Sequence, residues 1–162
     1  VNIKTLMKSH PNLHFLFLGD GAERKNLIKL NDRLGLTNTT FLSSVSKSEV
    51  IRYLSLIDVS LVNLRKSETF LTVIPSKIFE AAAMGKPILL GLQGETKGII
   101  QTHNAGLCFE PENAKEFLNQ LFSIIESSNY NSYREGCFRL AEAFDRKKIA
   151  LEVLETIKKC QK

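Results

Sequence analysis

The chain has 162 residues, of which 43% are hydrophobic, and its formal net charge is +5. This length suits a single domain with a real core, and the mixed composition excludes a low-complexity chain. No apolar run reaches the length of a transmembrane helix. The chain begins at Val1 with neither an initiator Met nor a signal peptide, so we expect a fragment of a larger protein.

The cysteines and the charge distribution narrow the class of protein further. Cys108, Cys137 and Cys160 stand far apart and form no CxxC pair, which favours a reduced, cytosolic setting. The basic excess lies late in the chain and indicates a solvated helical face, with a peripheral membrane contact as the second interpretation. Aromatic and basic residues do not alternate as in a nucleic-acid surface, so we expect no nucleic-acid partner.

Hydrophobic periodicity and turn residues predict a regular series of elements. The first half of the chain is predicted to contain a helix that ends at residue 9, a strand at 13–18, a helix at 22–34, a strand at 39–42, a helix from Ser46 or Ser48 to Leu54 and a strand at 58–64. The second half is predicted to contain a loop at 65–74, a helix at 76–84, a strand at 87–90, a helix at 96–102, a strand at 106–109 and helices at 113–127, 133–144 and 146–159.

Strands alternate with helices along most of the chain. This order predicts an α/β fold, a Rossmann-like parallel sheet with helices on both faces. Ligands bind such sheets at the carboxyl ends of the strands. The loops that follow predicted strands at 19–21, 43–45, 64–76 and 91–96 should therefore share one edge of the sheet.

A glycine turn follows the first predicted strand. Gly19 and Gly21 flank Asp20, and two glycines let the backbone approach a ligand closely. Exposed amides at the start of the next helix favour a phosphate. The full GxGxxG pattern is absent because Arg24 occupies its last position. An ordinary strand-to-helix turn is the alternative.

The short helix at residues 76–84 carries the main binding prediction. Pro75, Ser76 and Lys77 begin it, and free amides beside a lysine favour an anion. Glu80 lies one turn further in among apolar residues, where a carboxylate without a partner is costly. It could accept two hydrogen bonds from a ribose diol. The alternatives are a Pro-Ser cap with a solvated lysine, and a Glu80 stabilised by the helix dipole.

Several stretches together resemble a known family, the C-terminal domain of glycosyltransferase family 4. They are the Gly19-Asp20-Gly21 turn, residues 39–45, YLSLIDVSLV at 53–62, PSKIFEAAAMGKPI at 75–88, AGLCF at 105–109 and FDR at 144–146. The resemblance covers almost the whole chain. Members are retaining enzymes with the two-domain GT-B fold. The PSK variant is similar to the subgroup that transfers amino-deoxy sugars such as N-acetylfucosamine in bacterial O-antigen and capsule assembly.

The resemblance implies that residues 1–162 are a single nucleotide-sugar-binding domain, the C-terminal half of a two-domain protein whose other half binds the acceptor. It also assigns site residues but no catalytic residue. The matching positions are Glu80 for the ribose hydroxyls, Val73, Ile74, Ser76 and Lys77 for the region of the diphosphate, Ser44 and Val45 for the base, and Gly19 and Gly21 on the same edge.

The sequence departs from the family in three ways. A glutamate that contacts the donor sugar usually stands eight residues before Glu80, and here that position is Thr72, with Glu68 out of register. The family's first C-domain strand, central in the order 3-2-1-4-5-6, should precede residue 1. The acceptor domain is also absent. We therefore expect the chain alone to bind donor weakly and to catalyse nothing.

The leading function is donor binding in a retaining glycosyltransferase of bacterial surface polysaccharide synthesis. The donor would be a nucleotide-sugar, UDP-linked, and the acceptor a lipid-linked or oligosaccharide molecule. Amides and cations would stabilise the departing diphosphate, and without a DxD triplet we expect neither metal nor cofactor. A cytoplasmic protein, peripheral on the inner face of the membrane, would suit this role. A nucleotide-sugar 2-epimerase and a non-catalytic nucleotide-binding module are the alternatives.

Overall fold

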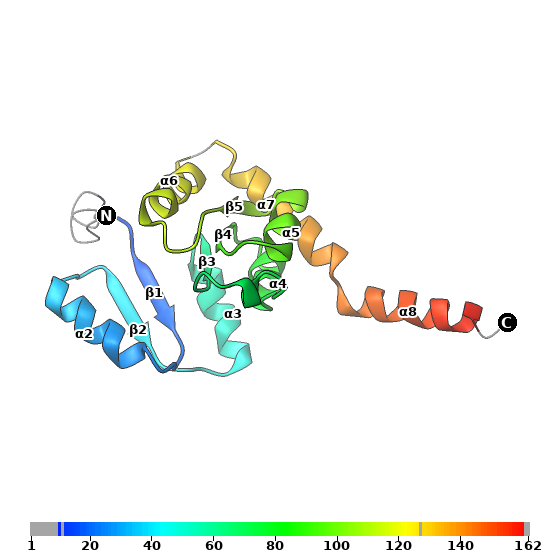
Figure 1. Ribbon diagram of the computed structural model, residues 1–162, viewed down its shortest axis with the longest axis horizontal. Helices are drawn as coiled ribbons and strands as arrows, with labels where there is room; N and C mark the ends of the chain where they lie inside the picture. Colours follow the sequence, from blue (N-terminus) through cyan, green and yellow to red (C-terminus); the bar gives the residue numbers. More distant parts are fainter. Residues whose placement is uncertain (1–9, 11, 127, 161–162) are drawn as a thin grey trace. The chain divides into compact units, whose positions relative to one another are not determined.

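The computed structural model describes residues 10, 12–126 and 128–160. The chain divides into two compact units, Val1–Arg52 and Tyr53–Lys162, which are described one at a time. Figure 1 shows the order of the elements along the chain. The predicted helix that ends at residue 9 lies outside the described residues, and a single domain over residues 1–162 stays a prediction.

The first unit contains a two-stranded parallel sheet. Its strands are β1 (Phe15–Leu18) and β2 (Thr39–Leu42), joined by α2 (Arg24–Leu34). The register places Phe15 opposite Thr39, and the rings of Phe17 and Phe41 stack with their centroids 4.7 Å apart. Both strands and the helix confirm the sequence prediction, and α2 ends at Gly35 as expected.

The helix α3 (Lys47–Leu56) begins at a capping box. Ser46 and Glu49 form it, because the Ser46 backbone N–H and hydroxyl both donate to the Glu49 carboxylate, at 3.0 and 2.6 Å. The Glu49 N–H donates back to the Ser46 hydroxyl at 3.4 Å. The Ser46 hydroxyl and then its N–H hold the pKa of the Glu49 carboxyl below its ordinary value. Of the two serines that the sequence offers, Ser46 is therefore the cap.

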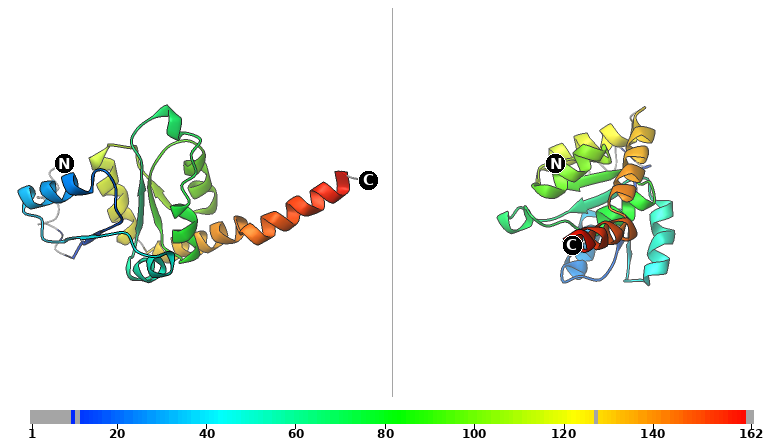
Figure 2. Two further views of the ribbon diagram at one scale, coloured as in Figure 1. Left: turned by 90° about the horizontal axis from the view of Figure 1, so that it is seen from below. Right: turned by 90° about the vertical axis from the view of Figure 1, so that its right-hand side faces the viewer.

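The second unit contains a three-stranded sheet. The order is β3 (Ser60–Asn63), β4 (Ile88–Gly91) and β5 (Gly106–Cys108), and both pairs are parallel. Helices flank these strands (Figures 1 and 2). They are α4 (Lys77–Ala83), α5 (Glu95–His103), α6 (Ala114–Ile125) and α7 (Tyr130–Ala143). The last helix of the chain is α8 (Arg146–Cys160).

The strand pairings confirm the predicted α/β class with parallel strands flanked by helices. Without its strand 1, the order 3-2-1-4-5-6 leaves two groups of neighbouring strands, 3-2 and 4-5-6. The observed neighbours, β2–β1 and β3–β4–β5, follow the same pattern. A further strand preceding residue 1 stays a prediction.

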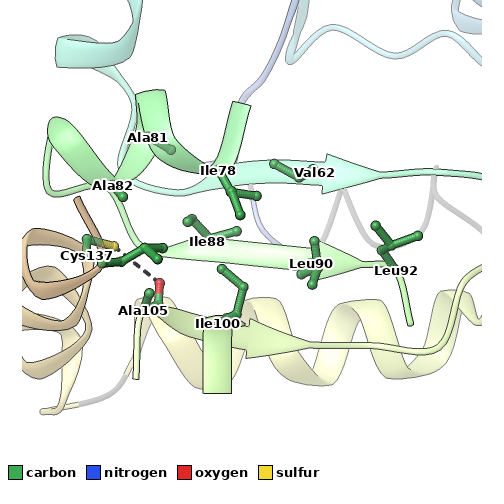
Figure 3. Close-up of a cluster of buried hydrophobic side chains, with 11 residues drawn as sticks. Val62, Ile78, Ala81, Ala82, Ile88, Leu90, Leu92, Ile100, Ala105 and Cys137 are labelled. Carbon is green, nitrogen blue, oxygen red and sulfur yellow. Dashed lines mark hydrogen bonds between the residues drawn. The ribbon is translucent and has the colours of Figure 1, made fainter. Parts of the chain in front are cut away.

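The core of the second unit surrounds β4, whose residues are all buried. Figure 3 shows Ile88 and Leu90 of this strand near Ile78 of α4 and Ile100 of α5. A strand with helices on both faces must be apolar throughout, which explains why residues 88–90 read as a continuous apolar run. The strand therefore fixes the position of the loops at its carboxyl end.

The helix α7 closes this core through Cys137. Its side chain is fully buried, and the carbonyls of Lys86 and Ala105 lie within hydrogen-bond distance of its thiol, at 3.2 and 3.3 Å. Figure 3 shows the bond to Ala105. Burial raises the pKa of the Cys137 thiol to about 12. The single proton of the neutral thiol thus has backbone acceptors within the core, and the Ala105 carbonyl also accepts from the Ile88 N–H at 2.9 Å.

The helix α8 differs from the others because none of its residues is buried. It exposes five large aliphatic side chains, namely Ile149, Leu151, Val153, Leu154 and Ile157. In the part of the chain that the structure describes, no helix has both the length and the apolarity needed to cross a membrane.

Candidate functional site

The main candidate site lies on the segment that leaves β3 at its carboxyl end. The segment runs through residues 64–76 into α4 and includes a short 3₁₀-helix, Glu68–Phe70, which the sequence did not predict. Its first residue is held to the sheet because the Leu64 N–H donates to the Gly91 carbonyl at 3.2 Å. The structure places six predicted site residues on this one segment: Thr72, Val73, Ile74, Ser76, Lys77 and Glu80.

The start of α4 leaves backbone amides unpaired. The Pro75 and Ser76 carbonyls accept from the amides of Ile78 to Glu80, which begins the helical ladder. Within the described ranges, the amides of Ile74, Ser76 and Lys77 donate to no acceptor. Ser76 occupies the N-cap position of α4, but it has helical backbone angles and its side chain makes no cap bond. These amides are available to an anion.

Glu80 faces away from the core. It is exposed and shares one side of α4 with the exposed Lys77, three residues earlier, whereas Ile78, Ala81 and Ala82 are fully buried. Among the residues the structure covers, its side chain has no hydrogen bond or ion pair. We expected the Glu80 carboxylate to lie at an energetic cost among apolar residues. Because its side chain is exposed, this expectation is wrong. Both the ligand and the dipole interpretations stay open.

A polar network joins the loops after β3, β4 and β5. The Lys66 ammonium lies 2.7 Å from the Glu110 carboxylate, which also accepts from the Gln93 amide at 2.6 Å. The Lys97 ammonium donates to the side-chain amide oxygen (Oε1) of Gln93 at 3.0 Å. The hydrogen bond from Lys66 lowers the pKa of the Glu110 carboxyl. Lys66 is exposed and Glu110 is half-buried, so solvent screens the ion pair and the network orders the loops more than it stabilises the fold.

The second candidate site lies in the first unit, where the glycine turn and the loop after β2 are joined. The Asp20 N–H donates to the Ser44 hydroxyl at 3.1 Å, and the Ser44 N–H donates to the Asp20 carboxylate at 2.7 Å. These reciprocal bonds bring Gly19, Gly21 and Ser44 together, with Val45 next along the chain. A cavity of about 210 Å³ opens beside both glycines.

Asp20 also explains how Arg24 is tolerated in the first turn of α2, where the helix dipole disfavours a positive charge. The Arg24 guanidinium lies 3.4 Å from the Asp20 carboxylate, so a local ion pair compensates the positive charge. The structure thus groups the predicted binding residues into two sets, one in each unit.

The Asp20 carboxyl should titrate below its ordinary pKa of 3.8, because the Ser44 N–H and hydroxyl hydrogen-bond to it and Arg24 lies beside it. Its contribution to stability should be complete above pH 3.8 and disappear as the pH falls through the lowered folded value. The measurement is a carbon-detected NMR titration of the Asp20 carboxyl. Ser44→Ala should raise its pKa part of the way, because the backbone bond remains, and Ser43→Ala is the matched control. An unchanged pKa in Ser44→Ala would contradict this account.

Metal-ligating side chains do not gather at either site. Over residues 10, 12–126 and 128–160, no group of three or more His, Cys, Asp or Glu residues could hold a metal ion.

Comparison with known proteins assigns the family. The sequence model of the glycosyl transferases group 1 family matches residues 2–142 of the chain. A search of the curated proteins finds no match.

Three solved structures illustrate the similarity in fold. Anabaena Alr3699/HepE in complex with UDP-glucose has a TM-score of 0.77 at 21% identity, with 97% of this chain covering 44% of that one. A glycosyltransferase from Rickettsia africae has a TM-score of 0.75 at 20% identity, with 99% of this chain covering 43% of that one. The pneumococcal O-GlcNAc transferase GtfA in complex with UDP and GlcNAc has a TM-score of 0.74 at 17% identity, with 98% of this chain covering 31% of that one.

These identities show a shared fold, and the chain spans less than half of each of the three structures. The family match rests on sequence and covers most of the chain. The chain therefore belongs to the glycosyl transferases group 1 family.

Proposed function

We propose that this chain is the donor-binding half of a retaining glycosyltransferase. In the full-length protein it would bind a UDP-linked sugar, which is transferred to a lipid-linked or saccharide acceptor held by a preceding domain. The observation that carries the proposal is the match of residues 2–142 to the glycosyl transferases group 1 family. Further support comes from structures of similar fold that were solved in complex with UDP or UDP-glucose.

The segment before and into α4 would bind the donor. The exposed Glu80 carboxylate would accept hydrogen bonds from the ribose hydroxyls. The unpaired amides of Ile74, Ser76 and Lys77 would donate to the diphosphate, with the Lys77 ammonium beside them. Because these groups supply positive charge where the leaving diphosphate gains negative charge, they would lower the barrier to transfer. This arrangement requires no metal or other cofactor, and Thr72 would stand on the sugar side.

The residues of the first unit would bind the base. Ser44 and Val45 would lie against it, and Gly19 and Gly21 would allow close approach of the backbone. The mutual hydrogen bonds of Asp20 and Ser44 support this role, because they give the two loops a defined arrangement within the unit.

Finer assignments are also proposals. The run PSKIFE at residues 75–80 supports membership in glycosyltransferase family 4 and its amino-deoxy-sugar subgroup. A cytoplasmic enzyme of O-antigen or capsule synthesis, with a peripheral membrane contact, would suit a lipid-linked acceptor.

The test uses the full-length parent protein. It is titrated calorimetrically with UDP, GDP and UDP-N-acetyl sugars, and nucleoside diphosphate release is measured with the same donors. Binding of one nucleoside diphosphate, and its release in the presence of acceptor, is the expected result. Conversion of the donor to an epimer would instead support a 2-epimerase. Binding without turnover would support a nucleotide-binding module, and binding of none of these ligands would overturn the proposal.

A further inference from the structure

The start of α5 lies against the proposed donor-binding segment and makes two hydrogen bonds to its backbone. We propose that Thr96, the second residue of α5, is a positioning residue that orients this segment for the diphosphate. The inference rests on the proposed function and adds to it a residue outside the segment itself.

Thr96 is a fully buried polar residue. Its hydroxyl donates to the Val73 carbonyl at 2.7 Å. One residue earlier, the Glu95 N–H donates to the Leu71 carbonyl at 2.9 Å. The start of α5 therefore holds two carbonyls of the segment, on either side of Thr72.

Gly94 allows this close approach. Its φ of 80° lies in the left-handed region, and a Cβ at this position would stand 2.0 Å from the Leu71 carbonyl oxygen. Any other residue would therefore push α5 and the segment apart. This contact is independent of the Thr96 hydroxyl and points to the same conclusion, that α5 sets the position of residues 71–73.

Peptide geometry connects this contact to the ligand. The Val73 carbonyl and the Ile74 N–H belong to one planar trans peptide unit, so they point in opposite directions. When Thr96 binds the carbonyl, the Ile74 N–H must point away from α5. That amide has no acceptor among the described residues, and a hydrogen bond on the carbonyl side of a peptide strengthens donation by its N–H. Thr96 thus directs and polarises an amide that the proposed function assigns to the diphosphate.

The same reasoning applies to the neighbouring peptide. The Glu95 N–H fixes the Leu71 carbonyl, and the Thr72 N–H of that peptide points the opposite way. Because this bond uses the backbone of Glu95, it survives any substitution of Thr96. The segment should therefore keep its course in a Thr96 variant and lose mainly the orientation of the Val73–Ile74 peptide.

The experiment compares Thr96→Val with Thr96→Ser in the full-length parent protein. Valine keeps the shape of threonine without the hydroxyl, and serine keeps the hydroxyl. Dissociation constants are measured for UDP by calorimetry and for uridine by NMR titration, or for GDP and guanosine if that base is the one bound. Thr96→Val should weaken binding of the nucleoside diphosphate by about tenfold, which is the effect of one lost hydrogen bond to a charged group. Uridine affinity in that variant and both affinities in Thr96→Ser should stay within about twofold of the wild type.

The ratio of the dissociation constants for the nucleoside diphosphate and the nucleoside separates a positioning role from a loss of stability. A lower folded fraction would weaken the binding of both ligands equally and leave this ratio unchanged. Thr156→Val is the matched control, since the Thr156 hydroxyl donates to the Glu152 carbonyl at 2.9 Å on the exposed helix α8. If Thr96→Val does not fold, Thr96→Ala takes its place. An unchanged ratio overturns the inference and leaves the proposed function standing. A wild type that binds no ligand overturns both.

Discussion

The Glu80→Ala variant of the full-length parent protein is expected to lose at least about tenfold in affinity for the nucleoside diphosphate, because two hydrogen bonds from the ribose to a charged carboxylate disappear. The fold should be unaffected. Glu80 is exposed, and its side chain has no partner in the part of the chain that the structure describes. Glu80→Gln retains one acceptor oxygen and should have an intermediate affinity.

A deoxynucleotide separates the ribose contact from other effects. If Glu80 binds the ribose hydroxyls, 2′-deoxy-UDP should bind the wild type more weakly than UDP does, and Glu80→Ala should bind the two ligands with more similar affinity. The loss from the substitution and the loss from the missing hydroxyl should therefore not add. The measurements are calorimetric titrations together with thermal unfolding. Glu142→Ala, which truncates an exposed glutamate on α7, is the control. Full additivity, or unfolding of Glu80→Ala, would contradict the ribose role.

Leu90→Ala is expected to give the largest loss of stability. Leu90 is fully buried in β4, the central strand of its sheet, near the core residues in Figure 3. Truncation removes buried methyl groups and leaves a cavity in a packed core, which typically lowers the free energy of unfolding by about 2–5 kcal/mol.

The neighbouring strand provides a matched control. Leu61 of β3 lies opposite Leu89 of β4, but 45% of its surface is exposed. Leu61→Ala should therefore lower the free energy of unfolding by about 1 kcal/mol or less. Urea unfolding of both variants, followed by circular dichroism, measures the difference. Equal losses would show that β4 is not the centre of the stabilising core.

The sequence predicted the regular elements because their signals are local. β2 is found at the predicted residues, and the continuous apolar run at 87–90 became the buried strand β4. The prediction was less accurate where contacts between residues far apart in the sequence determine where an element begins. The helix α7 begins at Tyr130 instead of residue 133, and the Tyr130 hydroxyl donates to the Asp58 carbonyl at 2.8 Å. No local pattern contains a contact between residues 72 positions apart.

The candidate site was predicted in part for the same reason. The segment up to Glu80 could be located from its motif, but the sequence was interpreted as if Glu80 shared the buried side of α4. Spacing could have corrected this, since Lys77 and Glu80 alternate with Ile78, Ala81 and Ala82. Thr96 could not have been identified, because its partner carbonyl lies 23 residues away and only the fold brings the two together.

The thiol of Cys137 gives the second unit a built-in chemical reporter. A cysteine reacts with an alkylating reagent through nucleophilic attack by its thiolate. The Cys137 thiol is fully buried with its pKa raised to about 12, whereas Cys160 is exposed. In a Cys108→Ser variant, which removes the half-buried third cysteine, Cys160 should be labelled at once, and Cys137 only in molecules whose α7 has separated from the sheet. The time course of labelling would therefore measure how often this core opens under native conditions, without denaturant.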